Sequence, residues 1–343
     1  MRFSDLCKNK KTVNMAFIGG SITEGDSYRC HIRDYLKANY PDNEFNEIRA
    51  GVSGTPSFLG VHRMDRDVIS HDPDMVFIEF SVNDNSGDKE LYCRSMEGMV
   101  RKVLNHNPNA LIAFIGTAVV WYFDEFYSKG REPEIVMAHK EIAAYYNIPY
   151  INVGKALFDY LQRSGEPTEK FLPDTVHPNV EGGKVYADEI TNYLVNYEWN
   201  IDFKSELKTV NSLEKATLVM ADKYVGENWK VSEDSMMGKN PNYIYSDVVD
   251  ATLELDFYGS DLGLYCTYDH DSGDIDYSID GGEWQRVSLW DTFCLQFDRA
   301  GWSLLAKDLE KKDHHVVMKI SENKNEQSKG HSVKIGAFLV SEK

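Results

Sequence analysis

The sequence has no long hydrophobic run, and this absence excludes a membrane-spanning protein. No apolar stretch approaches the roughly 18 to 20 residues that a transmembrane helix needs. Residues 1–11 are polar and charged, so we expect no signal peptide. Hydrophobic residues make up 42% of the 343 residues and charged residues 27%, as in ordinary globular proteins, so a disordered chain is excluded as well.

Cysteine is scarce, and its spacing excludes the common zinc and disulfide frameworks. No Cys-x-x-Cys pair occurs, and the number of cysteines is odd. The five are Cys7, Cys30, Cys93, Cys266 and Cys294. We therefore expect free thiols and a reducing, cytoplasmic location.

Net positive charge is also absent. The chain has 37 Lys and Arg against 55 Asp and Glu, which gives a formal net charge of −18 at pH 7. A polyanion would be repelled at long range, so we expect neither nucleic acid nor an anionic membrane as a partner. The acidic excess is spread over both halves of the chain. It is explained first by solubility, and it is compatible with a neutral or cationic small molecule as ligand.

The length predicts two domains. Up to residue 200, short apolar segments alternate with longer amphipathic ones, which is typical of a three-layer α/β sandwich around a parallel sheet. Strands are expected at residues 13–18, 46–50, 75–80, 111–116 and 149–153. Helices are expected at residues 28–39, 60–70, 89–107, 133–146 and 180–197.

The chain after residue 215 has a different pattern. Short alternating segments such as residues 274–279 and 316–320 are separated by turn dipeptides, which predicts a smaller antiparallel β-sandwich, jelly-roll-like, at residues 216–343. Residues 201–215 are polar, lack periodicity and are interpreted as a linker. The cluster Asp269-x-Asp271 lacks the distal glutamate of a calcium loop and is interpreted as a hairpin turn, so no metal site is predicted.

A serine follows the first expected strand. Gly19 and Gly20 allow a sharp turn at the carboxyl edge of the sheet and expose the hydroxyl of Ser21, although Ser21 as a plain helix N-cap explains this segment equally well. A nucleophilic serine needs a base, and the base needs a carboxylate. Asp174 and His177 supply both within one turn; in isolation such a pair is more often an ordinary loop.

Two further strand ends carry matching residues. Gly54 follows the second strand, and Asn83 and Asp84 follow the third. With the N–H of Ser21, the N–H of Gly54 and the amide of Asn83 would form a three-donor oxyanion hole. Each segment alone is explained by a simple turn. Four segments in this order favour a hydrolase site.

These four segments resemble the SGNH/GDSL-type serine hydrolases over residues 12–197. The nucleophile block is Gly-Gly-Ser-Ile at Gly19–Ile22, where the family usually has Gly-Asp-Ser-Leu, and Ser81 replaces a glycine of the third block. The resemblance implies Ser21, Asp174 and His177 as the catalytic triad, and Ser21, Gly54 and Asn83 as the oxyanion hole. It implies acyl transfer without any cofactor.

Aromatic and acidic residues indicate a sugar ester as the substrate. Aromatic faces stack on sugar rings and polar groups bind their hydroxyls, as the aromatic and acidic residues 121–127 would allow. The alternative is that these are core aromatic residues at the end of a strand. The C-terminal part resembles the carbohydrate-binding-type β-sandwiches appended to carbohydrate esterases, and it contains four of the six tryptophans. Predicted substrate contacts are Asp84, Trp121, Tyr122, Trp284 and Trp290, of which Trp284 or Trp290 is placed on a lid loop.

The sequence thus predicts a cytoplasmic carbohydrate O-acetylesterase acting on plant-polysaccharide oligosaccharides. Within the family the two-domain layout looks most like esterases of acetylated manno-oligosaccharides, with xylo-oligosaccharides next. Two alternatives remain open: a lipid esterase or acyl thioesterase, and a catalytically silent glycan-binding protein. Whether the chain forms a homo-oligomer is also left open.

Overall fold

The computed structural model describes residues 1–235 and 242–342. It divides into two compact units, Met1–Glu214 and Lys215–Lys343. All five cysteines are free thiols. Within the described ranges, no helix combines the length and apolar character needed to cross a bilayer.

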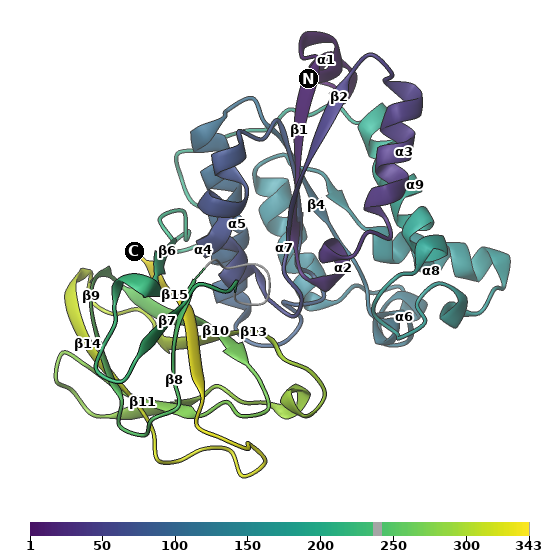
Figure 1. The fold of residues 1–343 in the computed structure, drawn as a ribbon. Helices are drawn as coiled ribbons and strands as arrows, with labels where there is room; N and C mark the ends of the chain where they lie inside the picture. The colour runs from purple at the N-terminus through teal and green to yellow at the C-terminus, as the bar shows by residue number, and fades with distance from the viewer. Residues whose placement is uncertain (236–241, 343) are drawn as a thin grey trace. The chain divides into compact units, whose positions relative to one another are not determined.

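The first unit is built on a parallel five-stranded sheet with the strand order β2-β1-β3-β4-β5 (Figure 1). Its strands are β1 (Thr12–Gly19), β2 (Glu44–Gly51), β3 (Met75–Glu79), β4 (Leu111–Ile115) and β5 (Tyr150–Ile151). Every residue of β3 and β4 is buried, because helices cover both faces of the sheet. In register, Gly19 pairs with Gly51 on one side and Glu79 on the other, so the carboxyl ends of three strands lie together.

Helices form a layer on each face of this sheet. Figure 1 shows α4, α5 and α7 on one face and α3, α8 and α9 on the other. The larger helices are α3 (Arg29–Asn39), α4 (Ser57–Asp67), α5 (Lys89–His106), α7 (Glu134–Tyr145), α8 (Val153–Ser164) and α9 (Val180–Asn196). Shorter ones are α1 (Phe3–Asn9), α2 (Ser21–Glu24) and α6 (Val120–Glu125), with single 3₁₀ turns at η1 (Ile69–His71), η2 (Tyr127–Lys129) and η3 (Thr168–Lys170). The predicted α/β sandwich is therefore confirmed.

The sequence pattern predicts a linker at residues 201–215. Residues 201–214 of this stretch belong to the first unit, where Lys208 and Thr209 are hydrogen-bonded to Glu97 of α5. The buried carboxylate of Glu97 accepts hydrogen bonds from the backbone N–H groups of Lys208 (2.7 Å) and Thr209 (2.8 Å) and from the hydroxyl of Tyr146 (2.6 Å). Leu213 is fully buried. The contacts that hold this segment are hydrogen bonds from its backbone, which require no particular side chains and so leave no hydrophobic periodicity in the sequence.

Glu97→Ala should therefore destabilise the first unit and loosen residues 201–214. The substitution leaves the buried hydroxyl of Tyr146 and two backbone donors without their acceptor, at an expected cost of about 2 to 4 kcal/mol. Urea unfolding measures the free energy, and limited proteolysis should then cut within 201–214. The matched control is Glu141→Ala, because Glu141 forms an exposed ion pair with Lys208 at 3.7 Å, which contributes little. Equal stability of the two variants would contradict this anchoring.

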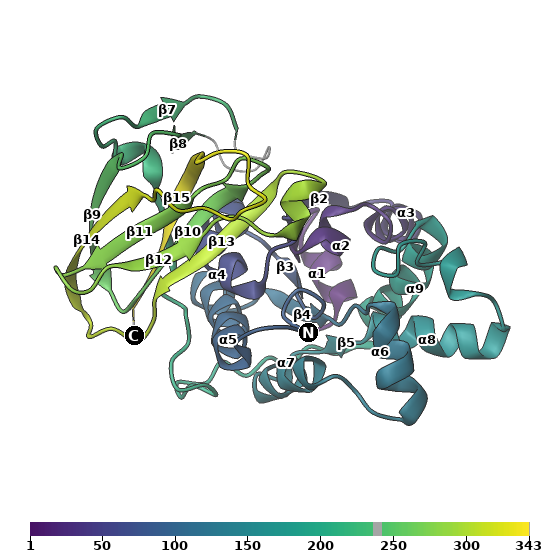
Figure 2. The ribbon, with the colours of Figure 1, turned by 90° about the horizontal axis from the view of Figure 1, so that it is seen from below.

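The second unit consists of two antiparallel sheets with a common core (Figure 2). One sheet has the order β13-β10-β15-β8-β7, with β6 paired to β15; the other has the order β12-β11-β14-β9. The strands are β6 (Thr217–Met220), β7 (Lys230–Ser232), β8 (Tyr243–Ser246), β9 (Thr252–Gly259), β10 (Asp261–Tyr268), β11 (Asp274–Ile279), β12 (Gln285–Ser288), β13 (Arg299–Ala306), β14 (Lys312–Ile320) and β15 (Val333–Ser341), with 3₁₀ turns at η4 (Ala221–Lys223) and η5 (Thr292–Leu295). The predicted second, antiparallel domain is confirmed.

Alternation of side chains explains the core of this unit. Along β9, Leu253, Leu255 and Phe257 point inward, while the residues between them are exposed or half-buried. Along β14, Val316, Met318 and Ile320 alternate in the same way. The four-stranded sheet therefore has one apolar face in the core and one polar outer face.

Candidate active site

Ser21 lies at the turn between β1 and α2, where the strand must bend sharply. Gly19 and Gly20 make this turn possible, because a Cβ atom on Gly19 would overlap the carbonyl oxygen of Glu79 and the side chain of Thr23. The hydroxyl-bearing residue is thus held at the carboxyl edge of the sheet, as the sequence predicted for a ligand site in an open α/β fold.

The structure brings Ser21, His177 and Asp174 into one hydrogen-bonded chain. Oγ of Ser21 lies 2.7 Å from Nε2 of His177, and Nδ1 of His177 lies 2.7 Å from Oδ2 of Asp174. His177 and Asp174 are about half exposed, at 46% and 56% of their side chains. The arrangement is that of a nucleophile, a base and the carboxylate that orients the base.

The loop that carries Asp174 and His177 is fixed by backbone hydrogen bonds. Oδ1 of Asp174 accepts from the N–H groups of Val176 (3.0 Å) and His177 (2.7 Å). Partial burial works to raise the pKa of Asp174, but the hydrogen bonds from His177 and Val176 outweigh it, so the pKa is lowered and the carboxylate stays charged.

Thr175, inside this loop, has a φ of 73°, which is the left-handed region that β-branched residues avoid. Its carbonyl accepts from the N–H of Val120 at 2.9 Å, which ties the loop to the start of α6. Such strain costs on the order of 1 to 3 kcal/mol and persists where surrounding contacts impose it. This conformation was not visible in the sequence.

Gly54 lies in an exposed turn after β2 with a φ of 70°, a conformation that favours glycine. The preceding residue, Ser53, donates from its N–H (2.7 Å) and its hydroxyl (2.5 Å) to the carboxylate of Glu24 in α2. Glu24 therefore joins the turn of Gly54 to the helix that begins with Ser21. Sequence reasoning missed this role, although Glu24 belongs to the same block as Ser21.

Asn83 lies directly against Gly20. A Cβ atom on Gly20 would overlap the amide oxygen of Asn83 and come within 3.2 Å of its nitrogen. The glycine that departs from the usual Gly-Asp-Ser-Leu block is thus the residue that leaves room for the Asn83 amide beside Ser21. From the sequence, Gly20 was interpreted only as tightening the turn.

Gly20→Ala should consequently impair turnover without unfolding the protein. The added methyl group displaces the amide of Asn83, which is the predicted oxyanion donor, and loss of one such donor typically lowers kcat by about 100- to 1,000-fold. Hydrolysis of an aryl acetate measures this, with circular dichroism to confirm folding. In an Asn83→Ala background the same substitution should have little further effect, because the displaced group is already gone.

The matched control is Gly25→Ala, at the end of α2. Its φ is −60°, and the nearest atom to an added Cβ is the carbonyl oxygen of Ser21 at 3.4 Å. Gly25→Ala should retain the parental kcat. A Gly20→Ala variant with unchanged kcat, or with the same loss in both backgrounds, would contradict the proposed link to Asn83.

Glu79 is a buried carboxyl group next to the turn that carries Ser21. It accepts hydrogen bonds from the hydroxyls of Thr117 (2.6 Å) and Thr23 (2.9 Å) and from the N–H of Gly20. Burial raises its pKa, and these hydrogen bonds offset the effect only in part. This residue connects β3 with the turn of Ser21 and with the loop after β4, and sequence reasoning did not single it out.

The raised pKa of Glu79 predicts a pH-dependent stability. Because the folded protein holds this proton more tightly than the unfolded chain, the contribution of Glu79 to stability decreases as pH rises above its ordinary pKa of about 4.3. Glu79→Gln removes the titration, so the stability of this variant relative to the parent should improve between pH 5 and pH 8. Urea unfolding at several pH values measures the difference. The exposed Glu169→Gln is the control for losing one charge, and a relative stability of Glu79→Gln that does not change with pH would refute the expectation.

The five predicted substrate contacts differ in burial: three are buried and two are exposed. Asp84 and Tyr122 are buried, at 3% and 0% exposure: Asp84 accepts from the N–H of Ser57, and Tyr122 donates to the carbonyl of Ser81. Trp290 lies in the core of the second unit. Burial corrects the prediction for these three, because none offers a face to a ligand. For Tyr122 this is the alternative of a core aromatic residue, whereas the motif positions of Asp84 and Trp290 gave no signal of burial.

The two other predicted contacts are exposed. Trp121, in α6, is 44% exposed and follows Val120, which is bonded to the loop of the triad. Trp284, in the second unit just before β12, is 54% exposed. Both remain predicted contacts.

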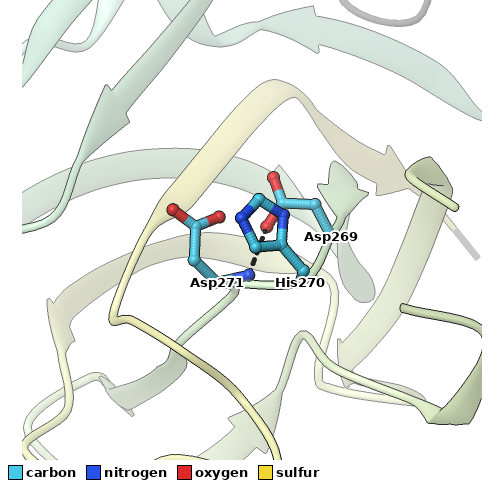
Figure 3. Close-up of side chains that lie close together, drawn as sticks. All are labelled: Asp269, His270 and Asp271. Atoms are coloured by element: carbon cyan, nitrogen blue, oxygen red, sulfur yellow. Dashed lines mark hydrogen bonds between the residues drawn. The ribbon is translucent and has the colours of Figure 1, made fainter. Parts of the chain in front are cut away.

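Asp269, His270 and Asp271 form a possible metal-ligand cluster (Figure 3), with ligand atoms within 4.8 Å of one another. The ammonium group of Lys334 donates to Asp269 at 2.5 Å, and the hydroxyl of Ser272 donates to the same carboxylate at 2.9 Å. A cation already pairs with Asp269, so the geometry does not favour a metal. The segment links β10 of one sheet to β11 of the other, which corrects the expected hairpin turn.

Comparison with known proteins agrees with this geometry. The model of the GDSL-like Lipase/Acylhydrolase family matches residues 17–185. No curated protein matches the chain. Among solved structures, a two-domain esterase (CEX) active on acetylated mannans, co-crystallized with mannopentaose, matches with a TM-score of 0.85 and 23% identity, over 99% of this chain and 94% of that one. A second crystal structure of a two-domain esterase (CEX) active on acetylated mannans matches with a TM-score of 0.84, 23% identity and the same coverage.

An acetylxylan esterase from Geobacillus stearothermophilus matches with a TM-score of 0.47 and 21% identity, over 57% of this chain and 97% of that one. The family match and the site geometry identify the first unit as a GDSL/SGNH hydrolase domain. The whole chain has the fold of a two-domain esterase of this type.

Proposed function

We propose that the protein is a carbohydrate O-acetylesterase with Ser21, His177 and Asp174 as its catalytic triad. The observation that carries the proposal is the chain of two 2.7 Å contacts from Ser21 through His177 to Asp174. A hydroxyl group so placed beside an imidazole, whose other nitrogen meets a carboxylate, is activated for attack on an ester.

The proposed reaction proceeds in two steps. Oγ of Ser21 attacks the ester carbonyl while His177 takes its proton, and the oxyanion is stabilised by the N–H groups of Ser21 and Gly54 and by the amide of Asn83. His177 then donates this proton to the departing sugar oxygen, the C–O bond breaks, and the acetyl group remains on Ser21. Water, deprotonated by His177, attacks the acetyl-enzyme; acetate leaves, and His177 returns the proton to Oγ of Ser21.

Acetylated manno-oligosaccharides are the proposed substrate, followed by xylo-oligosaccharides. Support comes from the match over both domains to a two-domain esterase that is active on acetylated mannans. The exposed indole of Trp121, tied through Val120 to the triad loop, offers a stacking face for a sugar ring. The five free thiols support the cytoplasm as the compartment.

Ser21→Ala should abolish acetate release from acetylated manno-oligosaccharides. Loss of the nucleophile lowers turnover by several orders of magnitude while the fold is retained, since Ser21 lies at the surface end of the sheet. His177→Ala should have a similar effect and Asp174→Asn a smaller one. Mass spectrometry before and after treatment, with the released acetate quantified, measures the reaction on mannan, xylan and pectin oligosaccharides.

A fluorophosphonate probe separates the enzyme from a silent glycan-binding protein, because labelling should occur in the parent and disappear in Ser21→Ala. An acyl chain-length series separates the acetylesterase from a lipid esterase or thioesterase. Efficient hydrolysis of long acyl esters or acyl-CoA, together with no acetate from any acetylated oligosaccharide, would refute the proposed substrate.

A further inference from the structure

The outer face of the four-stranded sheet in the second unit contains a hollow of about 590 Å³. It is lined by Thr252, Asp276, Trp284, Gln285, Arg286, Val317 and Lys319. Its size lies within the range of about 300 to 1,000 Å³ that is usual for small-molecule sites. This hollow lies wholly within one unit of the chain.

A single row of polar side chains crosses all four strands beneath the hollow. In register, Arg286 of β12 pairs with Asp276 of β11, Asp276 with Lys319 of β14, and Lys319 with Thr252 of β9. Paired residues share one face of a sheet, and the neighbours of this row along β9, β11 and β14 belong to the core, namely Leu253, Ile275, Tyr277, Met318 and Ile320. The row therefore presents hydrogen-bonding groups along a line on the outer face.

Trp284 borders this row with its indole ring. The Asp280–Gly281 turn, where both residues have a positive φ, reverses the chain between β11 and β12 shortly before Trp284. The ammonium group of Lys319 lies 5.7 Å from the centre of the indole ring, so the ring lies close to the row. At 54% exposure, much of this large apolar side chain faces solvent.

The charges of the row are balanced. The guanidinium group of Arg286 donates to both carboxylate oxygens of Asp276, at 2.6 and 3.3 Å, and Lys319 is paired with Asp250 at 2.7 Å. Neither cation is left to attract an anion, and the net charge of −18 disfavours an acidic ligand further. An indole face beside neutralised hydrogen-bonding groups matches a neutral sugar.

We propose that this hollow is a binding site for a neutral oligosaccharide, with one sugar ring stacked on Trp284 and hydroxyl groups hydrogen-bonded to the row of Asp276, Arg286 and Lys319. The inference rests on the proposed function only for the class of sugar. The role of the hollow is to bind the glycan, and none of its residues takes part in ester hydrolysis.

Binding is tested on the full-length Ser21→Ala protein, which removes the proposed nucleophile. Isothermal titration calorimetry with mannopentaose and xylopentaose should show a binding event. Its Kd should rise tenfold or more in Ser21→Ala/Trp284→Ala. The rise should be smaller in Ser21→Ala/Trp284→Phe, because phenylalanine keeps an aromatic face. The matched control is Tyr258→Ala, because Tyr258 is an exposed aromatic residue on the same face of β9, six residues beyond Thr252. It should leave that event unchanged.

Labelling with ¹⁵N-tryptophan localises the event. The chain has six tryptophans, so the indole signal that disappears in Trp284→Ala is assigned to Trp284 and should shift on titration with the sugar. An unmoved Trp284 signal, identical titrations with and without Trp284, or binding of oligogalacturonate alone would overturn the proposal. If the parent deacetylates no oligosaccharide while Trp284-dependent binding persists, the proposed function fails and the binding site stands.

Discussion

The buried carboxyl group of Glu79 is the interaction on which the geometry of the candidate site depends. It lies at the end of the central strand β3 and accepts hydrogen bonds from Gly20, Thr23 and Thr117, which follow β1 and β4. The carboxyl ends of three strands, β1, β3 and β4, are thus connected through one carboxyl group next to the turn of Ser21. A buried acceptor with three donors positions its neighbours sharply, because each donor left unpaired would cost the free energy of its desolvation.

Next to Glu79, the position of Ser21 depends on a close contact between the backbone of Gly20 and the side chain of Asn83. The residue before it, Gly20, is small enough for the Asn83 amide to lie against the backbone. On the other side, Glu24 holds Ser53 and so the turn of Gly54. The glycine at position 20, where the family usually has aspartate, and the position of the predicted oxyanion donor Asn83 are therefore linked by one steric requirement: a side chain at position 20 would displace the amide of Asn83.

Much of this arrangement was predictable, because parallel strands end at one edge and bring sequence-distant blocks together. The four blocks around Ser21, Gly54, Asn83 and His177 do lie at that edge. A local motif does not show whether its residues are buried, so the sequence pattern predicts Asp84 and Tyr122 as ligand contacts although both are hydrogen-bonded to backbone groups. Helix α8 (Val153–Ser164) was not predicted, and the charge of Glu97 that anchors residues 201–214 lies a hundred residues away in sequence.

The charge of the chain constrains how it can hold a substrate. A neutral glycan gains nothing at long range from a net charge of −18, so its affinity must come from contacts at short range. Indole faces supply such contacts, since they bury apolar C–H surface and need no counter-charge. Trp121 and Trp284 are tryptophans whose side chains are substantially exposed, and one stands in each unit of the chain. Their exposed indole faces give a neutral sugar chain the short-range contacts on which its binding depends.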